Sequence, residues 1–361
     1  MTHLESCPDG ERIEALYARM ARRRLDVVLI FNEANIRALT GVTCDNGCLV
    51  LSRDAAPFFI TDFRYVPMLH RLAPWLETVQ LKRGQTFAAA VKRRLTRSVA
   101  RLGYEGNVTA ACWLALKKAF PEAVLVDVAD EVLALRAVKT LPETAALVRA
   151  IALNDEIWSL ARKEIRPGMT EREIQRVIRG FMAMLGDGEA FETIVCAGAN
   201  AAECHHVPDE TRWEKGMPLL VDMGVKLDGV CSDMTRCLPP TGRGAAQQEY
   251  RRIYELVKRA NEAAIAAARP GLSCGDLDKV ARDVIAEAGY GNAFGHALGH
   301  GVGYEIHEEP SLRTGSSVVL EPGMFVTIEP GVYLEGRLGI RIEDLVMITP
   351  DGCRVLTRSR K

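Results

Sequence analysis

The chain has 361 residues, 48% of them hydrophobic, and its 46 basic and 47 acidic residues leave a net charge of -1. This length suits about two domains with apolar cores. The balanced charge provides no general attraction to nucleic acid or to an anionic membrane, so neither is an expected partner.

Ten cysteines are scattered along the chain without a Cys-x-x-Cys pair, and no secretory signal pattern opens the sequence. This arrangement favours reduced thiols in the cytoplasm. No stretch approaches the roughly 18 uninterrupted apolar residues of a membrane span. We therefore expect a soluble, cytoplasmic protein.

The first 138 residues alternate between helical and strand patterns. Apolar residues recur at helical spacing over residues 12–20, and a compact β-branched run follows at 26–31. Further strand patterns lie at residues 48–51, 58–61 and 124–128, and further helical patterns lie at residues 87–102 and 112–119. The alternation predicts an α/β domain.

In residues 139–361, pairs of helical patterns precede strand patterns. Pro142 suits the first turn of a long helix that reaches Glu164. Thr170 and Glu173 have the spacing of a capping box, which opens a helix to about residue 185. A second pair of helical patterns lies at residues 250–268 and 275–288. We expect an α+β domain with helices packed on a sheet.

This second domain contains an internal repeat. Arg-Pro-Gly-Met-Thr at residues 166–170 recurs as Arg-Pro-Gly-Leu-Ser at residues 269–273, an offset of 103. Further along, Asp222 and Glu329 are equivalent at an offset of 107. A period of about 100 residues is too long for a solenoid, so we expect two half-domains that face a shared centre.

The first copy places two carboxylates on an expected hairpin. Strand patterns flank Asp228-Gly229, which is a strong signal for a two-residue turn. Such a turn pairs Asp222 with Thr235 and makes Asp222 and Asp233 diagonal neighbours, roughly 7 to 8 Å apart at Cα. Two carboxylates on one face repel each other unless a cation lies between them. A metal ion would meet this need.

The second copy carries Glu329 and Glu343 on either side of a turn near residues 335–337. Four carboxylates brought together by the repeat, with His300 as a fifth ligand, suit two divalent ions a few ångströms apart. Each carboxylate alone is more often structural, so the hypothesis depends on the whole set. Arg341 is expected to steady a ligating carboxylate.

Histidines are rare, yet five of the seven lie between His205 and His307. His296 and His300 stand in Phe-Gly-His-Ala-Leu-Gly-His-Gly, whose glycines let the backbone approach a ligand closely. His206 is expected to be a neighbour of His205 that either packs within the protein or faces solvent. The nearby cysteines lack zinc-site spacing and are expected to be small core residues: Cys196, Cys204, Cys231 and Cys237.

In this order, these residues resemble the pita-bread metallopeptidases, which comprise proline-specific aminopeptidases, prolidases, methionine aminopeptidases and the metal-free creatinases. The catalytic resemblance spans about residues 142–357, and residues 35–41 and 61–65 resemble the family's creatinase-like N-terminal domain. The resemblance implies a creatinase-like α/β domain at residues 1–138, followed by a pseudo-two-fold pita-bread catalytic domain at residues 139–361.

The resemblance also implies a dinuclear site for two divalent ions, with manganese the expected metal and cobalt or zinc as alternatives. Its ligands would be Asp222, Asp233, His300, Glu329 and Glu343. His205 and His307 would bind the substrate carbonyl and the developing tetrahedral centre, and His296 would lie in the substrate pocket. Glu329 would also accept the proton of the attacking water, which bridges the two ions.

Residues 341–344 and 307–310 resemble the proline peptidases more than the methionine aminopeptidases. We therefore expect an aminopeptidase that releases the N-terminal residue from peptides with proline second, with an Xaa-Pro dipeptidase (prolidase) as the alternative. A creatinase-like amidinohydrolase or a non-catalytic peptide-binding module is less expected, because neither needs five metal ligands. Residues 197–204 depart from the usual pattern, which often has proline where Cys204 stands. The resemblance further implies a homodimer.

Overall fold

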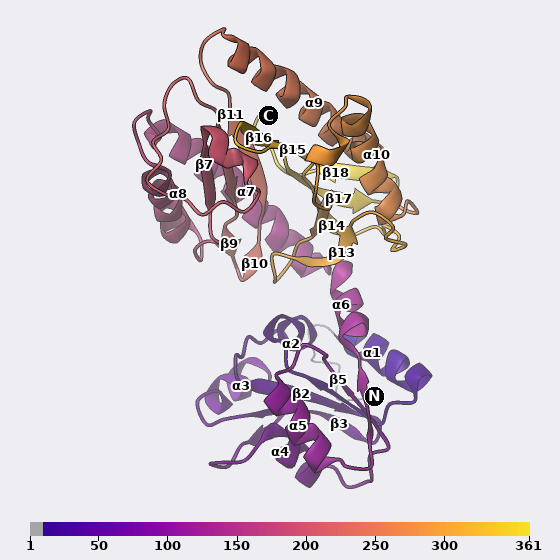
Figure 1. Cartoon of the computed structure of the whole chain (residues 1–361). Coiled ribbons are helices and arrows are strands. Elements are labelled where there is room, and N and C mark those ends of the chain that lie inside the picture. The colour runs from indigo at the N-terminus through magenta and orange to yellow at the C-terminus, as the bar shows by residue number, and fades with distance from the viewer. Residues whose placement is uncertain (1–9) are drawn as a thin grey trace. The chain divides into compact units, whose positions relative to one another are not determined.

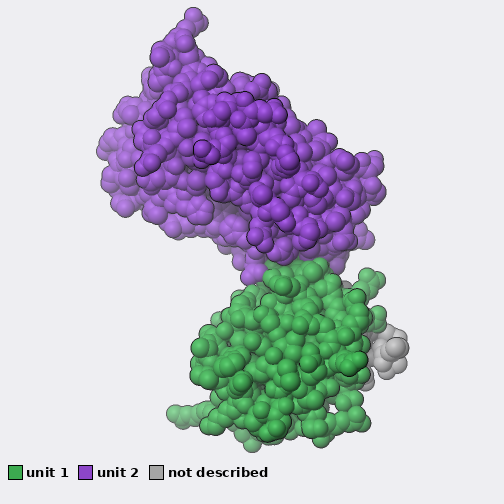
Figure 2. Space-filling view, turned by 45° about the vertical axis from the view of Figure 1, so that its right-hand side comes forward, with its two compact units in different colours: residues 1–136 green, residues 137–361 purple. Residues whose placement is uncertain are grey.

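The computed structural model describes residues 10–361 of the chain. Two compact units comprise residues Met1–Arg136 and Ala137–Lys361, and Figure 2 shows each in its own colour. Among the described residues, no helix is both long and apolar enough to cross a membrane. Mixed helix and sheet content in both units agrees with the expected fold class.

The first unit is built on a six-stranded mixed sheet with the order β4-β3-β2-β1-β5-β6. Its strands are β1 (Val27–Ile30), β2 (Gly47–Ser52), β3 (Ala55–Thr61), β4 (Glu77–Gln80), β5 (Arg101–Tyr104) and β6 (Val124–Asp127). The central strand β1 pairs antiparallel with β2 and parallel with β5. Because β1 is buried along its whole length, it has a continuous apolar sequence.

Helices pack on both faces of this sheet. They are α1 (Gly10–Arg23), α2 (Glu33–Thr40), α3 (Val66–Leu72), α4 (Phe87–Arg94), α5 (Ala110–Ala119) and α6 (Ala129–Ala137). Val28 and Ile30 share a core cluster with residues of α1, α2 and α3. Val27 and Leu29 share another with residues of α4 and α5. The two faces therefore follow the two-residue period of the strand.

The prediction of one helix over residues 87–102 was wrong beyond Arg94. Helix α4 ends there, and residues 101–104 form strand β5 between β1 and β6. Leu102 is completely buried between its two parallel neighbours, so sheet pairing overrides the helical spacing of the sequence.

The second unit folds with two pairs of helices. They are α7 (Leu141–Glu164), α8 (Glu171–Leu185), α9 (Ala245–Ala267) and α10 (Cys274–Glu287). The predicted capping box at the start of α8 is confirmed, with Thr170 and Glu173 bonded reciprocally. Figure 1 shows α8 and α10 on opposite flanks of this unit, with the strands between them.

The repeat in the sequence recurs as equivalent contacts in the structure. Gly168 donates its backbone N–H to the carbonyl of Trp213, and Gly271 donates in the same way to Leu320. Each long helix also carries a buried asparagine that donates to a strand carbonyl, Asn154 in α7 and Asn261 in α9. The two half-domains therefore share one plan, as the offset of about 100 residues predicts.

The strands of this unit form two larger sheets and two short hairpin extensions. One sheet has the order β11-β8-β7, from β7 (Ile194–Ala197), β8 (Leu219–Met223) and β11 (Met234–Leu238). The other has the order β13-β12-β14-β17-β18, from β12 (Gly299–Gly301), β13 (Glu308–Leu312), β14 (Phe325–Ile328), β17 (Asp344–Thr349) and β18 (Gly352–Val355). The extensions pair β9 (Lys226–Leu227) with β10 (Val230–Cys231), and β15 (Gly331–Leu334) with β16 (Leu338–Arg341).

The predicted register of the first hairpin is confirmed. Asp222 in β8 pairs with Thr235 in β11. The turn residues Asp228 and Gly229 have φ values of 52° and 69°. Two consecutive positive φ angles are the requirement of a type I′ turn, which Asp-Gly satisfies at little cost.

Candidate metal centre

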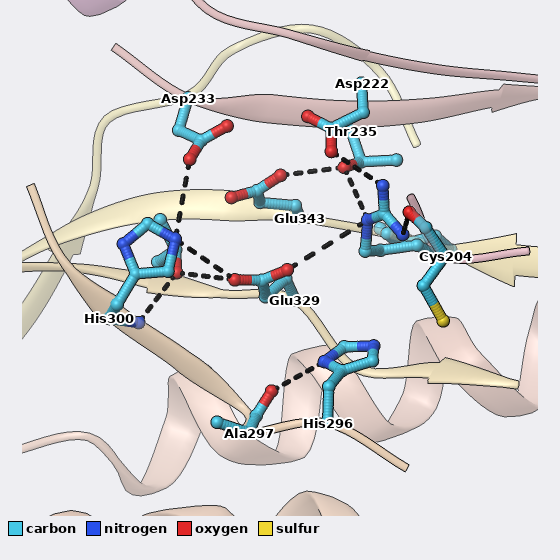
Figure 3. A network of polar contacts seen from close by, with 12 residues as sticks. Cys204, Asp222, Asp233, Thr235, His296, Ala297, His300, Glu329 and Glu343 are labelled. Atoms are coloured by element: carbon cyan, nitrogen blue, oxygen red, sulfur yellow. Dashed lines mark hydrogen bonds and ion pairs between the residues drawn. The ribbon is translucent and has the colours of Figure 1, made fainter. Parts of the chain in front are cut away.

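Five side chains, carried by strands or by residues next to a strand end, point toward one space between the two half-domains (Figure 3). Asp222 lies in β8, and Asp233 directly precedes β11. Glu329 directly follows β14, Glu343 directly precedes β17, and His300 is the middle residue of β12. The structure thus brings together all five residues that the sequence predicts as metal ligands.

Short distances link these side chains. Nε2 of His300 lies 3.3 Å from Oε1 of Glu329 and 3.6 Å from Oδ2 of Asp233. Ligand atoms of Asp233, His300 and Glu343 lie within 4.8 Å of one another. This spacing suits side chains that share a cation.

Unpartnered oxygen atoms give a test of whether the site fits metal ions. Oδ1 of Asp222, Oδ1 of Asp233 and Oε1 of Glu343 are buried and have no hydrogen-bond partner. Buried polar atoms are normally paired, and an unpaired carboxylate oxygen carries a large desolvation cost. Divalent ions would satisfy these oxygens, and a set of carboxylates with one imidazole suits manganese, cobalt or zinc.

The pKa values of the four carboxyl groups are shifted because the groups are buried close to one another and to other charges. Burial, together with the charges of neighbouring carboxylates, raises the pKa of Asp233 and of Glu343 well above the usual range. Burial also raises the pKa of Asp222, which the cation of Arg341 partly opposes. For Glu329, burial is outweighed by the hydrogen bond and charge of His300, and its pKa falls.

Arg341 and Thr235 hold two of the carboxylates. Nη2 of Arg341 donates to Oδ2 of Asp222 at 2.6 Å, and its Nε donates to Oγ1 of Thr235 at 3.0 Å. Thr235 in turn donates to Oε2 of Glu343 at 2.8 Å. The sequence predicts that Arg341 steadies a ligating carboxylate, and the structure shows it bonded to Asp222. Sequence reasoning missed the role of Thr235, although the expected pairing with Asp222 already placed this hydroxyl beside the site.

Thr327 orients the other two residues of the centre. Its Oγ1 donates to Oε1 of Glu329 at 3.1 Å and accepts from the backbone N–H of His300 at 3.0 Å. Nδ1 of His300 donates to the carbonyl of Gly301 at 3.0 Å, which leaves Nε2 facing the carboxylates. No pattern in the sequence distinguishes Thr327 from an ordinary strand threonine.

His205 and His307 lie at the exposed edge of this centre. The ring of His307 packs edge-on against His300, with 4.4 Å between the ring centroids. Burial lowers the pKa of His307, and the charges of His300 and of His205 lower it further. His205 therefore lies close enough to His307 to affect its pKa, and both side chains are exposed.

His296 and Tyr333 form a second polar pair beside the carboxylates. Nδ1 of His296 donates to the carbonyl of Ala297 at 2.7 Å, so its Nε2 accepts from the hydroxyl of Tyr333 at 2.8 Å. The same hydroxyl accepts from Nη1 of Arg341 at 2.8 Å. Burial lowers the pKa of His296, which favours its neutral form. Tyr333 was not anticipated, because its strand sequence carries no sign of a polar role.

The prediction that Cys204 is a core residue was wrong. Its side chain is only half-buried and hydrogen-bonds to Tyr333, while its carbonyl accepts from Nη1 of Arg341 at 3.5 Å. Burial raises the pKa of the Cys204 thiol. His206, by contrast, is buried and packs within the protein, which is one of the two placements expected for it.

Comparison with known proteins identifies both parts of the chain. Residues 145–350 match metallopeptidase family M24, and residues 12–138 match the creatinase/prolidase N-terminal domain. The Xaa-Pro dipeptidase of Pyrococcus furiosus is 32% identical over 353 residues, which cover 97% of this chain and 99% of that protein.

Solved structures with the same fold include an Xaa-Pro dipeptidase from Bacillus anthracis, with a TM-score of 0.91 and 34% identity. That comparison covers 97% of this chain and 98% of the other. An X-Pro aminopeptidase from Thermotoga maritima has a TM-score of 0.83 and 31% identity, covering 94% and 97% of the two chains. The chain therefore belongs to metallopeptidase family M24.

Proposed function

We propose that the protein is a metal-dependent Xaa-Pro dipeptidase, or prolidase. The sequence alone led us to prefer an aminopeptidase and to keep the dipeptidase as the alternative. The comparisons support the opposite order, since relatives that cover nearly the whole chain are named Xaa-Pro dipeptidases. Residues 1–138 would be the N-terminal domain, and residues 139–361 the catalytic domain.

The observation that carries this proposal is the group of unpartnered, buried carboxylate oxygens at the centre of the second unit. Two divalent ions, with manganese preferred, would be held by Asp222, Asp233, His300, Glu329 and Glu343. When bound, such ions lower the pKa of water and polarise a peptide carbonyl.

The chain's own groups would bind the substrate and move its protons. Glu329, whose Oε1 lies 3.3 Å from Nε2 of His300, would accept a proton from the attacking water. His307 and His205, at the exposed edge, would hydrogen-bond the substrate carbonyl and the charge that develops on it. His296, neutral and fixed by Tyr333, would line the pocket for the substrate.

An Xaa-Pro aminopeptidase remains the second candidate, because a solved X-Pro aminopeptidase shares the fold over 94% of this chain. The two activities differ in the length of peptide that the pocket accepts. A dipeptidase requires the free carboxylate of proline, whereas an aminopeptidase accepts a chain that continues beyond proline.

Hydrolysis of three peptides tests the proposal. An Xaa-Pro dipeptide, an Xaa-Pro-Xaa tripeptide and an Xaa-Ala-Xaa tripeptide would be incubated with protein and manganese, and the products identified by mass spectrometry. We expect cleavage of the dipeptide alone and none by Glu343→Ala. Cleavage of the proline tripeptide alone would establish the aminopeptidase instead, and no cleavage by metal-loaded protein would reject both.

The homodimer and the cytoplasmic location also belong to this proposal. The nine cysteines among the described residues are free thiols, in line with a reducing compartment. Size-exclusion chromatography with light scattering would test the dimer, which should elute at about twice the chain mass of 39.7 kDa.

A further inference from the structure

A second polar cluster lies where helix α8 meets the segment that carries His205. Its centre is Glu171, the first residue of α8, whose side chain is completely buried. Oε1 of Glu171 accepts from the backbone N–H of Ala197 at 2.7 Å and from Nδ2 of Asn200 at 3.0 Å. Oε2 accepts from Nε2 of His206 at 2.7 Å and from the backbone N–H of Asp209 at 3.0 Å. We name this group the Glu171 cluster.

The Glu171 cluster does not have the character of another metal site. Ligand atoms of Glu171, His206 and Asp209 do lie within 4.8 Å of one another. A carboxylate offers about four lone-pair positions, however, and four N–H donors already occupy those of Glu171. This carboxylate therefore differs from those of the metal centre, where three buried oxygens have no partner. Its chemistry is that of a structural acceptor for a loop.

His206 is held in this cluster by acidic groups on both ring nitrogens. Nε2 faces Glu171, and Nδ1 lies 3.3 Å from the exposed carboxylate of Glu203. Burial by itself lowers the pKa of His206, but the hydrogen bonds and charges of Glu171, Glu203 and Asp209 outweigh it and the net shift is upward. Both nitrogens can then donate, which fits an imidazolium between carboxylates.

The donors of the cluster come from both ends of one segment, residues 197–209, which we name the His205 loop. Helix α8 also binds this loop through its own backbone, because Arg172 donates its N–H to the carbonyl of Asp209. The unpaired N–H groups of a helix N-terminus thus find partners in the loop. Between these two ends, the chain carries His205 and Cys204.

The opposite side of the His205 loop contacts strand β16 of the other half-domain. A Cβ atom on Gly339 would lie 1.6 Å from the carbonyl oxygen of Ala201, so the loop approaches the strand as closely as glycine permits. The carbonyl of Cys204 also accepts from Arg341 at the end of β16. The His205 loop is therefore held between the buried carboxylate of Glu171 on one side and strand β16 on the other.

We infer that Glu171 and His206 are positioning residues, which hold the His205 loop so that His205 stays at the edge of the metal centre beside His307. Neither residue contacts the carboxylates of that centre in the structure, so their effect on turnover is exerted through His205. This inference rests on the proposed peptidase function. It adds two residues, outside the predicted site, on which the reaction depends.

Steady-state kinetics on an Xaa-Pro dipeptide, with manganese, tests the inference through matched variants. Glu171→Gln and His206→Leu should lower kcat by about 100-fold, the penalty expected for a misplacement of about 1 Å, and change KM much less. His206→Gln keeps an N–H at the Nε2 position and should retain most of the activity. Glu210→Gln removes an exposed carboxylate from the adjoining segment and should match the wild type.

Two further measurements separate positioning from general instability and from the choice of substrate. Metal content per chain should be equal in all variants. Hydrogen exchange of the full-length protein should rise within residues 197–209 for Glu171→Gln and His206→Leu, and this readout needs no substrate. If the wild type were inactive, the peptidase proposal would be rejected. The exchange measurement would still test whether Glu171 and His206 hold the His205 loop. The inference would be overturned if exchange in the His205 loop were unchanged, or if exchange increased throughout the second unit. It would also be overturned if kcat stayed normal although exchange in the loop had increased.

Discussion

The guanidinium of Arg341 lies 2.6 Å from the carboxylate of Asp222 and 4.0 Å from that of Glu329. These two carboxylates are the equivalent residues of the sequence repeat, one from each half-domain. One buried cation therefore interacts with the symmetry-related pair, and it also fixes Thr235 and Tyr333 through hydrogen bonds. Arg341 therefore holds a carboxylate from each half-domain, Asp222 and Glu329, in position relative to the other.

Replacement of Arg341 by methionine should weaken metal binding by about 10- to 100-fold, because the groups that orient ligating side chains commonly have effects of this size. Isothermal titration of the chelated protein with manganese would measure the affinity. Arg337→Gln, which removes an exposed arginine from the same hairpin, is the matched control. Equal affinities for Arg341→Met and the wild type would show that Asp222 needs no support from the guanidinium.

Glu343→Gln should stabilise the metal-free protein while it abolishes the response to metal. In the absence of cations, burial and the neighbouring carboxylates raise the pKa of Glu343, so folding must either protonate this group or leave its charge beside theirs, and a neutral amide of the same shape avoids that cost. We expect a gain of about 1 to 3 kcal/mol in the free energy of unfolding with a chelator present.

Urea denaturation with chelator and with manganese would measure both effects. Manganese should raise the midpoint of the wild type and leave that of Glu343→Gln nearly unchanged. A variant that is less stable than the wild type in chelator would contradict the view that the carboxylates repel one another.

The ion pair between His206 and Glu171 should make stability depend on pH. Because the pKa of His206 is raised in the folded protein, the pair contributes fully below the ordinary histidine pKa of about 6.5. The contribution disappears as the pH rises through the raised pKa. The wild type should therefore exceed His206→Leu by about 1.5 to 3 kcal/mol at pH 6 and by less at pH 9. Urea denaturation of both proteins in chelator, from pH 6 to 9, would measure the difference in their free energies of unfolding. A difference that stays constant with pH would contradict the prediction.

Gly339→Ala should displace the His205 loop, since the added methyl group would overlap the carbonyl of Ala201. Overpacking of this kind costs about 1 to 3 kcal/mol. Dipeptide turnover should fall more than metal binding does. Gly352→Ala is the control, because its Cβ would meet no atom within 4 Å. Full activity of Gly339→Ala would mean that the loop can shift without effect.

Lys139→Met should destabilise the second unit strongly. Nζ of Lys139 lies 2.6 Å from Oε2 of Glu308, and both side chains are nearly inaccessible to water. Removal of one partner from a buried ion pair costs about 3 to 5 kcal/mol. Lys163→Met, at an exposed position of α7, should have almost no effect. Thermal or urea unfolding of the two variants would distinguish them, and similar midpoints would contradict the expected importance of the pair.

The repeat made much of the catalytic unit predictable from sequence. Two helices and a hairpin per half follow from capping residues, Asp-Gly and the apolar periods, and the pairing of Asp222 with Thr235 follows from turn length. Local rules of this kind depend on residues close in sequence. These rules predict which carboxylates lie on the same face of the sheet, and so they predict the candidate ligands.

Long-range contacts could not be predicted in the same way. The four donors to Glu171 come from residues 26 to 38 positions away, and no period or motif relates them. Tyr333 is similar, because its hydroxyl meets Arg341 and His296 only after the strands are assembled. Strand β5 escaped notice because pairing with β1 and β6 decides its conformation. These features depend on tertiary packing, which overrides local propensity.

The two hairpins of the catalytic unit differ by a single turn residue. Leu227 pairs with Val230 across two residues, whereas Leu334 pairs with Leu338 across three. Beyond the turn the equivalent positions are therefore 108 apart, and Arg341 occupies the place that Asp233 holds in the other half. A carboxylate in one copy thus corresponds to a cation in the other. Two copies of the first half would lack this guanidinium, and two copies of the second half would carry it twice, so a centre with a single guanidinium requires the two unlike halves.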